Sequence, residues 1–548
     1  MVLSNQDAIN STTREHFFVI TLLVALLVWL PVTVLAEAPA VMGPPSPTLV
    51  RTTPLSIEEV LARIELTHPL LRATGLYRAD ARAKVLKALA AWEPKLRNEV
   101  EVDRFQTWNL TNGVGVPNTL TGGYSDTMLK IGHPWGFNIF GGIRNGFGDH
   151  AVLNGHPGNF QNSVDGGPIA FPTDLQLFYP QQILIVGGAF NLLRGFMINP
   201  EYAEFQQAEL SGPQAEVKVA QKRQDLFLAG AVQYWDWQVA VKQAEVQKQT
   251  LAVAEDRFVQ IQGRAKAGAV ALLDAVEAEQ EVQRRREAAI AAQRKVEYEQ
   301  YKLSFFLWQN GEPVTPQPEW APEFTGETPL PTEGEIAAAK IEAREGRPEV
   351  RELAIDIQMN NIDLRLAKND LLPKLQFEGG PAVGGIYWIG GFGYRVGTLF
   401  SMPLFNREAR GKAAHAEAQQ ERLNYELYYA EQQVGLDVDN WVSAIVRARE
   451  RVRAATESYR LAKALEAGER TRFNMGATNL LFVNTRERNA VEAAYQLYRA
   501  QYDYVLARGG FLWARGALSK PVAENVLAKY GDSSVAAGLS GHKLEGRD

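Results

Sequence analysis

The chain has 548 residues and carries 57 Lys and Arg against 63 Asp and Glu, a formal net charge of −6 at pH 7. This mildly acidic balance argues against nucleic acid as a partner, because proteins that bind nucleic acid gather basic residues on one face. The sequence has no cysteine, which excludes disulfides, thiolate metal sites and a lipid-modified cysteine.

The N-terminus has the pattern of a secretory signal peptide. Positively charged residues precede an apolar run from Phe17 to Leu30, and Val34-Leu35-Ala36 places small residues where a signal peptidase reads them. We expect residues 1–36 to be a cleaved signal and residues 37–54 to be a linker. The alternative is an uncleaved membrane anchor, for which the apolar run is short.

The sequence also contains a tandem repeat. Two short motifs occur again 279 positions later, His68-Pro69 as Arg347-Pro348 and Pro94-Lys95-Leu96 as Pro373-Lys374-Leu375. Further along, residues 264–273 recur as residues 472–481, displaced by 208 positions. Repeats of this size indicate that both halves supply the same piece of an architecture. The displacement falls from 279 to 208 between the two sets of motifs, so the first copy contains about 71 residues that the second lacks (279 − 208 = 71).

Long helix-forming stretches dominate both halves. The run from Glu201 to Lys266 is rich in Ala, Glu, Gln and Arg, and as a helix it would span about 100 Å. We expect a helix of about 60 Å to follow it and to end near Gln309, and one of about 50 Å from Ile57 to Ala91. Apolar residues at seven-residue spacing predict coiled-coil packing, namely Val232, Val239, Val246 and Val253 in the first half and Val434, Trp441, Ala448, Ala455 and Ala462 in the second.

Alternation predicts strands between these helices. After the signal, no run of about 18 apolar residues is available for a spanning helix. In the second half, every other residue from Phe392 to Phe400 is largely apolar, namely Phe392, Tyr394, Val396, Thr398 and Phe400. The residues between them are mostly small or polar. Leu375 and Phe377 suggest a partner strand, and the first half repeats the alternation from Leu184 to Leu192. This pattern fits a barrel in lipid around a wet lumen, although a buried sandwich strand would look similar.

Two such hairpins would give four strands per chain. Four strands cannot close a membrane barrel, because open edges would leave unpaired backbone groups in hydrocarbon, and the smallest usual barrel has about eight strands. The barrel must therefore be shared between chains. A dimer would supply eight strands and a trimer twelve.

Together these features resemble the TolC family of outer-membrane efflux proteins, from about Pro54 to Gly516. The resemblance is carried by the duplicated proline motifs, the junction at Met402-Pro403-Leu404-Phe405 and the two glycine turns with their Leu-Leu pairs. It implies a mixed fold with a membrane β-barrel plus a long α-helical barrel. In that fold a trimeric twelve-stranded barrel lies in the outer membrane, and a coiled-coil helical tunnel continues it through the periplasm.

The resemblance also implies a function. The chain would be the outer-membrane channel component of a tripartite efflux or type I secretion system. In that role it is a passive exit duct and docks with a periplasmic adaptor protein and an inner-membrane pump or transporter.

The repeat sets the expected domains. We expect a first repeat at residues 55–312, a Pro-rich linker at 313–332, a second repeat at 333–517 and a C-terminal tail at 518–548. The additional residues fall within the first hairpin, where we expect an enlarged surface loop at about 109–181. An extra strand pair within this segment is the alternative.

Four residues of the enlarged segment could suggest a metal site, namely His133, Asp149, His150 and His156. Their spacing matches no recognised ligand pattern, and the polarity of a surface loop explains them. We therefore expect no metal and no other cofactor.

The resemblance assigns adaptor docking to the two glycine turns. The matching positions are Arg264, Gly268, Ala269, Leu272 and Leu273 in the first turn and Arg472, Gly476, Ala477, Leu480 and Leu481 in the second. The alternative is that the glycines only permit the chain to reverse.

A candidate periplasmic gate follows the first turn. Asp274 and Glu277 are three positions apart and share one helix face. Some family members close their entrance with acidic residues at these offsets in the second repeat, where this sequence has Phe482 and Thr485. The alternative for Asp274 and Glu277 is an ordinary solvated helix surface.

Enzyme motifs are missing from the sequence. It has no His-Glu-x-x-His, no phosphate loop and no Gly-x-Ser-x-Gly, so we expect no catalytic residues. The competing hypothesis is a periplasmic coiled-coil adaptor or scaffold protein, which would share the signal and the long helices but would not need the alternating strands.

Overall fold

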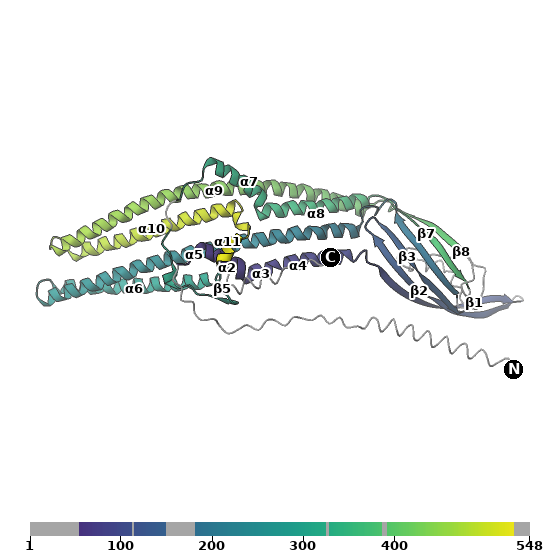
Figure 1. The fold of residues 1–548 in the computed structure, drawn as a ribbon, viewed down its shortest axis with the longest axis horizontal. Coiled ribbons are helices and arrows are strands. Elements are labelled where there is room, and N and C mark those ends of the chain that lie inside the picture. Colours follow the sequence, from purple (N-terminus) through teal and green to yellow (C-terminus); the bar gives the residue numbers. More distant parts are fainter. Residues whose placement is uncertain (1–53, 112–113, 149–180, 325–327, 386–391, 531–548) are drawn as a thin grey trace, which may run out of the picture. The chain divides into compact units, whose positions relative to one another are not determined.

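Long antiparallel helices and one curved sheet make up the fold (Figure 1). The computed structural model describes residues 54–111, 114–148, 181–324, 328–385 and 392–530. The expected signal peptide at 1–36 and most of the expected linker at 37–54 lie outside the described residues. Within the described residues, no helix is long and apolar enough to cross a membrane.

The helices repeat in the two halves of the chain. In the first half, α2 (Ile57–Thr67), α3 (Pro69–Gly75) and α4 (Tyr77–Leu89) precede the sheet, and α5 (Pro200–Lys266) and α6 (Leu272–Ser304) follow it. In the second half, α7 (Glu333–Gly346) and α8 (Pro348–Asp370) precede the strands, and α9 (Arg407–Asn474) and α10 (Leu480–Ala514) follow them. The helices α5 and α9 are 67 and 68 residues long. The expected long helices and the expected repeat are therefore present.

The helix expected from Ile57 to Ala91 is broken into three pieces. Pro69 has no backbone N–H to continue α2, and a new helix starts there. The His68 side chain caps this new helix by accepting a hydrogen bond from the Leu70 N–H at 3.3 Å. The helix expected to reach Gln309 ends at Ser304, and a small hairpin of β5 (Trp308–Gln309) and β6 (Glu312–Pro313) follows it. Asn310 and Gly311 turn this hairpin with positive φ.

A core cluster forms where the first-half helices meet. Trp237 on α5 is fully buried, together with Ile64 of α2 and Leu303 of α6. Gly230 of α5 makes room for this packing, since a Cβ there would lie 2.5 Å from Ile64 Cδ1. The C-terminal segment joins the same region, because Leu518 packs against this cluster. The beginning of the expected C-terminal tail at 518–548 is thus ordered, with 3₁₀ helix η3 (Ala517–Ser519) and helix α11 (Glu524–Tyr530).

The sheet has six antiparallel strands among the described residues, in the order β1-β2-β3-β4-β7-β8. They are β1 (Lys95–Thr111), β2 (Val114–His133), β3 (Phe137–Gly148), β4 (Gln181–Asn191), β7 (Lys374–Gly385) and β8 (Phe392–Ser401). The hairpin expected in the second half is confirmed, with Leu375 opposite Phe400 and Phe377 opposite Thr398. Phe377 also faces Phe190 on β4, which joins the two halves of the chain in one sheet.

The expected count of four strands per chain is wrong for the described residues. The whole of β2 and of β3 lies in the segment expected to be an enlarged loop at about 109–181, so the alternative of an extra strand pair holds there. The alternation in these strands is short and interrupted by glycine, as at Ile139, Gly141 and Ile143. Hydrogen bonding to neighbouring strands stabilises β2 and β3 as strands nonetheless.

A matched pair of glycine substitutions tests the helix packing. Gly230→Ala should lower the free energy of unfolding by about 1 to 3 kcal/mol, because Ile64 is fully buried and has no room to move aside. Gly263→Ala should raise it by up to about 1 kcal/mol, because nothing lies within 4 Å of the added methyl group and alanine favours the helix. Thermal unfolding of the purified protein followed by helix ellipticity would measure both. Equal midpoints for the two variants would contradict the close contact at Gly230.

Candidate functional site at the ends of the helical hairpins

The two helical hairpins end in turns of the same backbone geometry. Between α5 and α6, Gly268 has φ 71°, and the Ala269 N–H donates to the Arg264 carbonyl at 2.9 Å. Between α9 and α10, Gly476 has φ 73°, and the Ala477 N–H donates to the Arg472 carbonyl at 2.9 Å. Positive φ is strained for residues with a Cβ, so glycine is required at both positions. The repeated motif therefore encodes a repeated helix reversal, and both turns lie at the end of the helices remote from the sheet (Figure 1).

The four leucines that follow the turns differ in exposure. Leu272 and Leu273 are 76% and 75% exposed, and Leu481 is 55% exposed. Leu480 is only 5% exposed and packs in a cluster with Ile261 and Ala278 of the first hairpin. Leu480 therefore holds the two hairpins together, whereas the other three leucines present apolar surface to solvent. The sequence repeat alone cannot reveal this difference.

Other large apolar side chains near the turns are also exposed, namely Val276, Met475 and Phe482. Apolar groups clustered at the end of a structure are typical of a surface that another protein covers. The flanking Arg264 and Arg472 are exposed as well. The structure thus brings the expected docking residues to two adjacent tips, with Leu480 as the exception.

Asp274 and Glu277 lie in the first two turns of α6 and are half-buried. Within the described part of the chain, neither carboxylate forms an ion pair. Phe482, at the position in α10 that matches Asp274, is exposed, and the hydroxyl of Thr485 donates to the Leu481 carbonyl at 2.8 Å. The acidic pair is therefore a feature of the first hairpin alone.

A buried charge cluster close to the turns was not expected from the sequence. Glu487 of α10 is 2% exposed and accepts hydrogen bonds from Arg257 of α5 at 3.1 Å, Arg285 of α6 at 2.8 Å and Arg470 of α9 at 3.2 Å. Arg257 also donates to the Asn484 side chain at 3.1 Å. One carboxylate thus ties four helices from both halves of the chain. Its partners are up to 230 positions away in sequence, and no local pattern marks them.

The environment of Glu487 fixes its charge. Burial by itself would raise the pKa of this carboxyl, but the hydrogen bond and charge of Arg257, with Arg285 and Arg470, outweigh burial and hold the pKa below its ordinary value. A carboxyl with a depressed pKa in the folded state stabilises the fold above the pKa of the unfolded chain, about 4.3. That contribution is lost as the pH falls through the lower folded-state pKa.

Glu487→Gln should therefore destabilise the end of the hairpins strongly. Removing one charge from a buried ion pair costs about 3 to 5 kcal/mol, because the arginines stay buried without their partner. Glu457→Gln is the matched control, since Glu457 forms an exposed pair with Arg460 and its loss should change stability little. Limited proteolysis at the turns and the thermal midpoint would compare them, and the difference should shrink below about pH 4. Equal effects of the two substitutions would contradict the role of Glu487.

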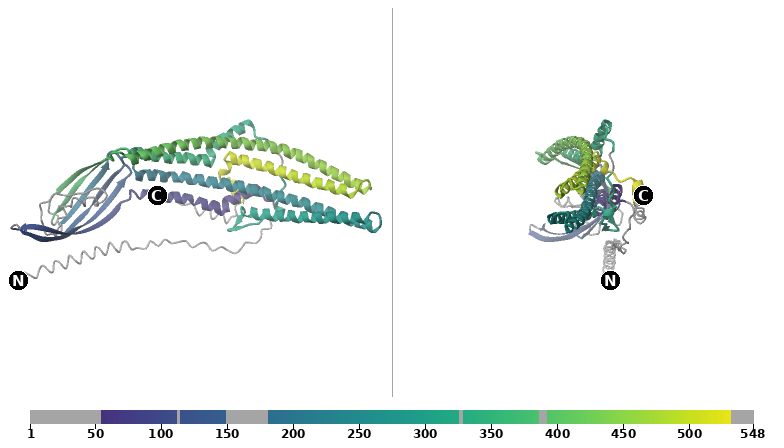
Figure 2. Two further views of the ribbon diagram at one scale, coloured as in Figure 1. Left: turned by 180° about the vertical axis from the view of Figure 1, so that it is seen from behind. Right: turned by 90° about the vertical axis from the view of Figure 1, so that its left-hand side faces the viewer.

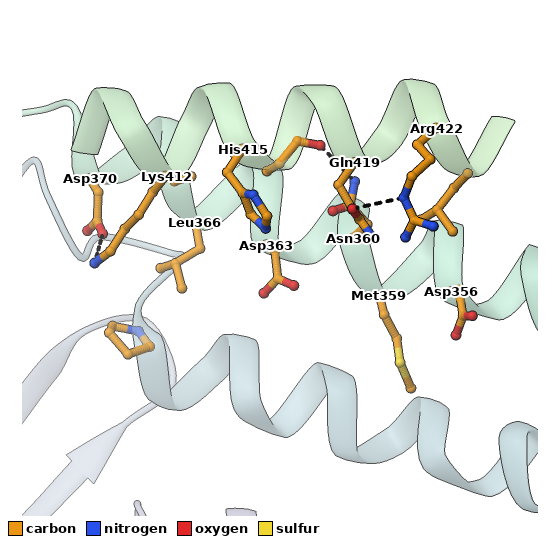
Figure 3. Close-up of a pocket in the computed structure, with 14 residues that line it drawn as sticks. Asp356, Met359, Asn360, Asp363, Leu366, Asp370, Lys412, His415, Gln419 and Arg422 are labelled. Atoms are coloured by element: carbon orange, nitrogen blue, oxygen red, sulfur yellow. Dashed lines mark hydrogen bonds and ion pairs between the residues drawn. The ribbon is translucent and has the colours of Figure 1, made fainter. Parts of the chain in front are cut away.

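A groove lies closer to the sheet. It has a volume of about 810 Å³ and lies between α8, α9 and the beginning of α5 (Figure 3). Its polar side chains are largely engaged with their neighbours, as Asp370 is with Arg194 at 3.0 Å and Lys412 at 3.7 Å, and Asp363 with Gln207 at 2.6 Å. Burial raises the pKa of Asp356 at the other end of the groove. These contacts brace α5 against α8.

Metal binding has no support in the described residues. No three His, Asp or Glu side chains there could hold a metal ion together. His133 stacks on Phe137 with ring centroids 4.2 Å apart. The other three residues considered for a metal site, Asp149, His150 and His156, lie outside the described residues.

Comparison with known proteins agrees with this geometry. Residues 341–510 match the family described as outer membrane efflux protein. This stretch of the chain therefore carries the sequence pattern of the family, in agreement with the resemblance to the TolC family. The matched residues lie inside the second repeat expected at 333–517. None of the curated proteins matches the sequence significantly.

Solved outer-membrane channels share the fold at low sequence identity. The outer-membrane channel OprN is 15% identical, with 85% of this chain and 91% of that chain covered and a TM-score of 0.60. The CmeC outer membrane channel of Campylobacter jejuni is 12% identical, with coverage of 90% and 96% and a TM-score of 0.58. VceC of Vibrio cholerae is also 12% identical, with coverage of 84% and 96% and a TM-score of 0.58.

The family and the fold together give the function in outline. The chain is the channel component of an efflux system in the outer membrane, with its strands in the membrane and its helical tunnel in the periplasm. The adaptor or scaffold alternative does not account for the six-stranded sheet. The family is one of channels.

Proposed function

We propose that three copies of the chain form a passive exit duct that docks with a periplasmic adaptor protein and, through it, with an inner-membrane pump or transporter. The observation that carries this proposal is that the helices form a single layer. Toward the turns they neighbour one another in the order α6, α5, α10, α9, and near the sheet in the order α4, α5, α8, α9. Figure 2 shows this layer from the side and from its end.

A single layer of helices leaves two faces and two edges without a partner. Curving the layer and joining it to further copies covers the edges and turns one face into the wall of a tube. Twelve helices from three copies, spaced about 9 Å apart, enclose a bore of about 25 Å after allowing about 10 Å for the thickness of a helix. Such a bore passes a range of solutes without a shaped pocket, in both efflux and type I secretion.

Adaptor docking at the turns rests on the exposed apolar tips. Leu272, Leu273 and Leu481 would be covered by the adaptor, and Arg264 and Arg472 would flank this contact. Helical hairpins are a common element of such recognition, since an apolar helix face fits a groove or another hairpin. The two tips of each chain would give six contacts in a trimer.

Bulky substitutions at the turns test docking and assembly together. Ala269→Trp with Ala477→Trp should abolish efflux in cells, because both residues are exposed beside the turn glycines, while native mass spectrometry should still give trimers. Ala252→Trp, at an exposed position of α5, is the matched control and should retain efflux. Normal efflux in the turn variant would contradict docking, and a monomeric native protein would contradict the duct.

The acidic pair provides a test of the gate. Three copies would arrange Asp274 and Glu277 as rings of carboxylates near the entrance, and like charges in a narrow aqueous neck concentrate cations. Asp274→Asn with Glu277→Gln should reduce cation preference and weaken block by multivalent cations in planar-bilayer recordings. Unchanged selectivity and block would place both carboxylates on the outer surface. Glu279→Gln, an exposed neighbour, is the control that should change neither property.

A further inference from the structure

The extra strands β2 and β3 are built like the wall of a barrel. Their exposed apolar side chains lie on the same face of the sheet as those of the neighbouring strands. The register shows this directly, with Leu129 opposite Leu96, Ile131 opposite Ile139 and Ile143 opposite Leu184. All six of these side chains are exposed. An apolar band therefore crosses the sheet from β1 to β4, with Gly141 and the polar pair of Asn98 and Thr127 within it, and it continues through Val383 to β7.

The opposite face of the same two strands is mixed, with an ion pair beside the buried apolar side chains of Met128 and Phe140. Asp126 of β2 lies opposite Arg144 of β3, and the Arg144 Nε donates to the carboxylate at 2.7 Å. Asp126 is buried on this face. Apolar residues on one side and paired charges on the other are expected when strands separate lipid from a wet lumen. A surface loop has no need of this alternation.

The turn between β2 and β3 is joined to the helical end of the sheet. Gly136 has φ 85°, and its carbonyl accepts a hydrogen bond from the Asn191 N–H at the end of β4. The Asn199 side chain, which caps α5, donates to the Pro134 carbonyl at 2.8 Å. Exposed Trp135 lies in this turn, where barrels place aromatic residues at the membrane boundary. The extra pair thus reaches the same level as β4.

The two edges of the sheet are suited to pair with each other across copies. Because the number of strands is even and all neighbours are antiparallel, β8 of one copy runs antiparallel to β1 of the next. The ends of β1 and β8 that adjoin the helices would also lie at the same level, since β1 begins at Lys95 soon after α4 and β8 ends at Ser401 shortly before α9. Exposed apolar residues continue to both edges, with Val100 on β1 and Phe400 on β8.

The widths of the two layers are close when the sheet has six strands. Four helices spaced about 9 Å apart make a wall about 36 Å wide per chain. Strands about 4.8 Å apart and tilted by about 40° each occupy about 6 Å of circumference. Six strands therefore span about 38 Å, whereas four strands span only about 25 Å.

We propose that each chain contributes all six strands to the barrel, so that three copies close an eighteen-stranded barrel through β8–β1 pairing between copies. This barrel is as wide as the helical tunnel and about 1.5 times the diameter of a twelve-stranded one, because diameter grows roughly in proportion to strand number. The exit through the outer membrane is then no narrower than the tunnel. This inference rests on the trimer proposed above.

Engineered cysteine pairs in the naturally cysteine-free chain test the strand order. In oxidised outer membranes, Ile143→Cys with Leu184→Cys should form a disulfide within one chain, and so should Leu96→Cys with Leu129→Cys. Val100→Cys combined in turn with Leu184→Cys, Val186→Cys or Phe190→Cys should form none. A disulfide between Val100→Cys and any of these β4 positions would overturn the proposal, because β1 and β4 would then be neighbours and β2 and β3 would lie outside the barrel.

A second set of pairs separates this inference from the proposed function. Phe400→Cys combined in turn with Leu96→Cys, Asn98→Cys or Val100→Cys should link chains into trimers on a non-reducing gel. Trimers with β1–β4 disulfides would refute the eighteen-stranded barrel and leave the duct intact, whereas a lack of oligomers by native mass spectrometry would refute the duct. Electron microscopy of the wild-type trimer gives an independent measure. A barrel clearly narrower than the tunnel would overturn the eighteen-strand count.

Discussion

Backbone groups in hydrocarbon must be hydrogen-bonded, and this requirement governs the sheet. Among the described residues, the N–H and C=O groups along one side of β1 and one side of β8 have no strand beside them, and each such group left unpaired in lipid costs several kcal/mol. The helices face a related difficulty, because a layer one helix thick leaves two edges open. Further copies of the chain arranged around an axis would cover both the strand edges and the helix edges. The same chain thereby supplies the wall of a barrel and the wall of a tunnel.

The joints between the strands and the helices keep the two walls in register. Asn199 starts α5 by accepting the Tyr202 N–H at 2.8 Å, and its amide group also binds the β2–β3 turn. Arg194, just before this helix, pairs with Asp370 at the end of α8. These contacts connect the start of α5 to the β2–β3 turn and the segment before α5 to the end of α8. The transition therefore needs no flexible linker.

Much of the fold could be predicted from the sequence, because its signals are local. Composition and seven-residue spacing identified α5 and α9, and duplicated glycines identified both turns. Alternation identified β7 and β8, where Phe392, Tyr394, Val396 and Phe400 share one parity. The strands β2 and β3 were only an alternative, since glycines interrupt their apolar positions and pairing with β1 and β4 decides their conformation. Likewise, the break at His68-Pro69 was visible as a motif but not as the end of a helix.

The site was predicted only in part, because contacts between distant segments decide it. The turns are where the motifs place them, yet Leu480 and Leu272 occupy matching positions with opposite exposure. Glu487 and its arginines come from four helices, and no spacing in the sequence connects them. The groove at Asp363 and Asp370 likewise depends on how α5 lies against α8. Packing between the halves, which a repeat motif does not encode, determines each of these features.

The buried Glu487 cluster has a mechanical consequence for a ring of copies. Within each chain it clamps the first hairpin to the second. At the seam between neighbouring chains, the repeat would put Leu465 at the position of Arg257 and Ala493 at that of Arg285, with Glu279 in place of Glu487. At these positions the seam would lack the buried arginine and carboxylate pairs of the Glu487 cluster. In the proposed trimer, three stiff seams would then alternate with three more compliant ones, and widening of the entrance would be concentrated at the compliant seams.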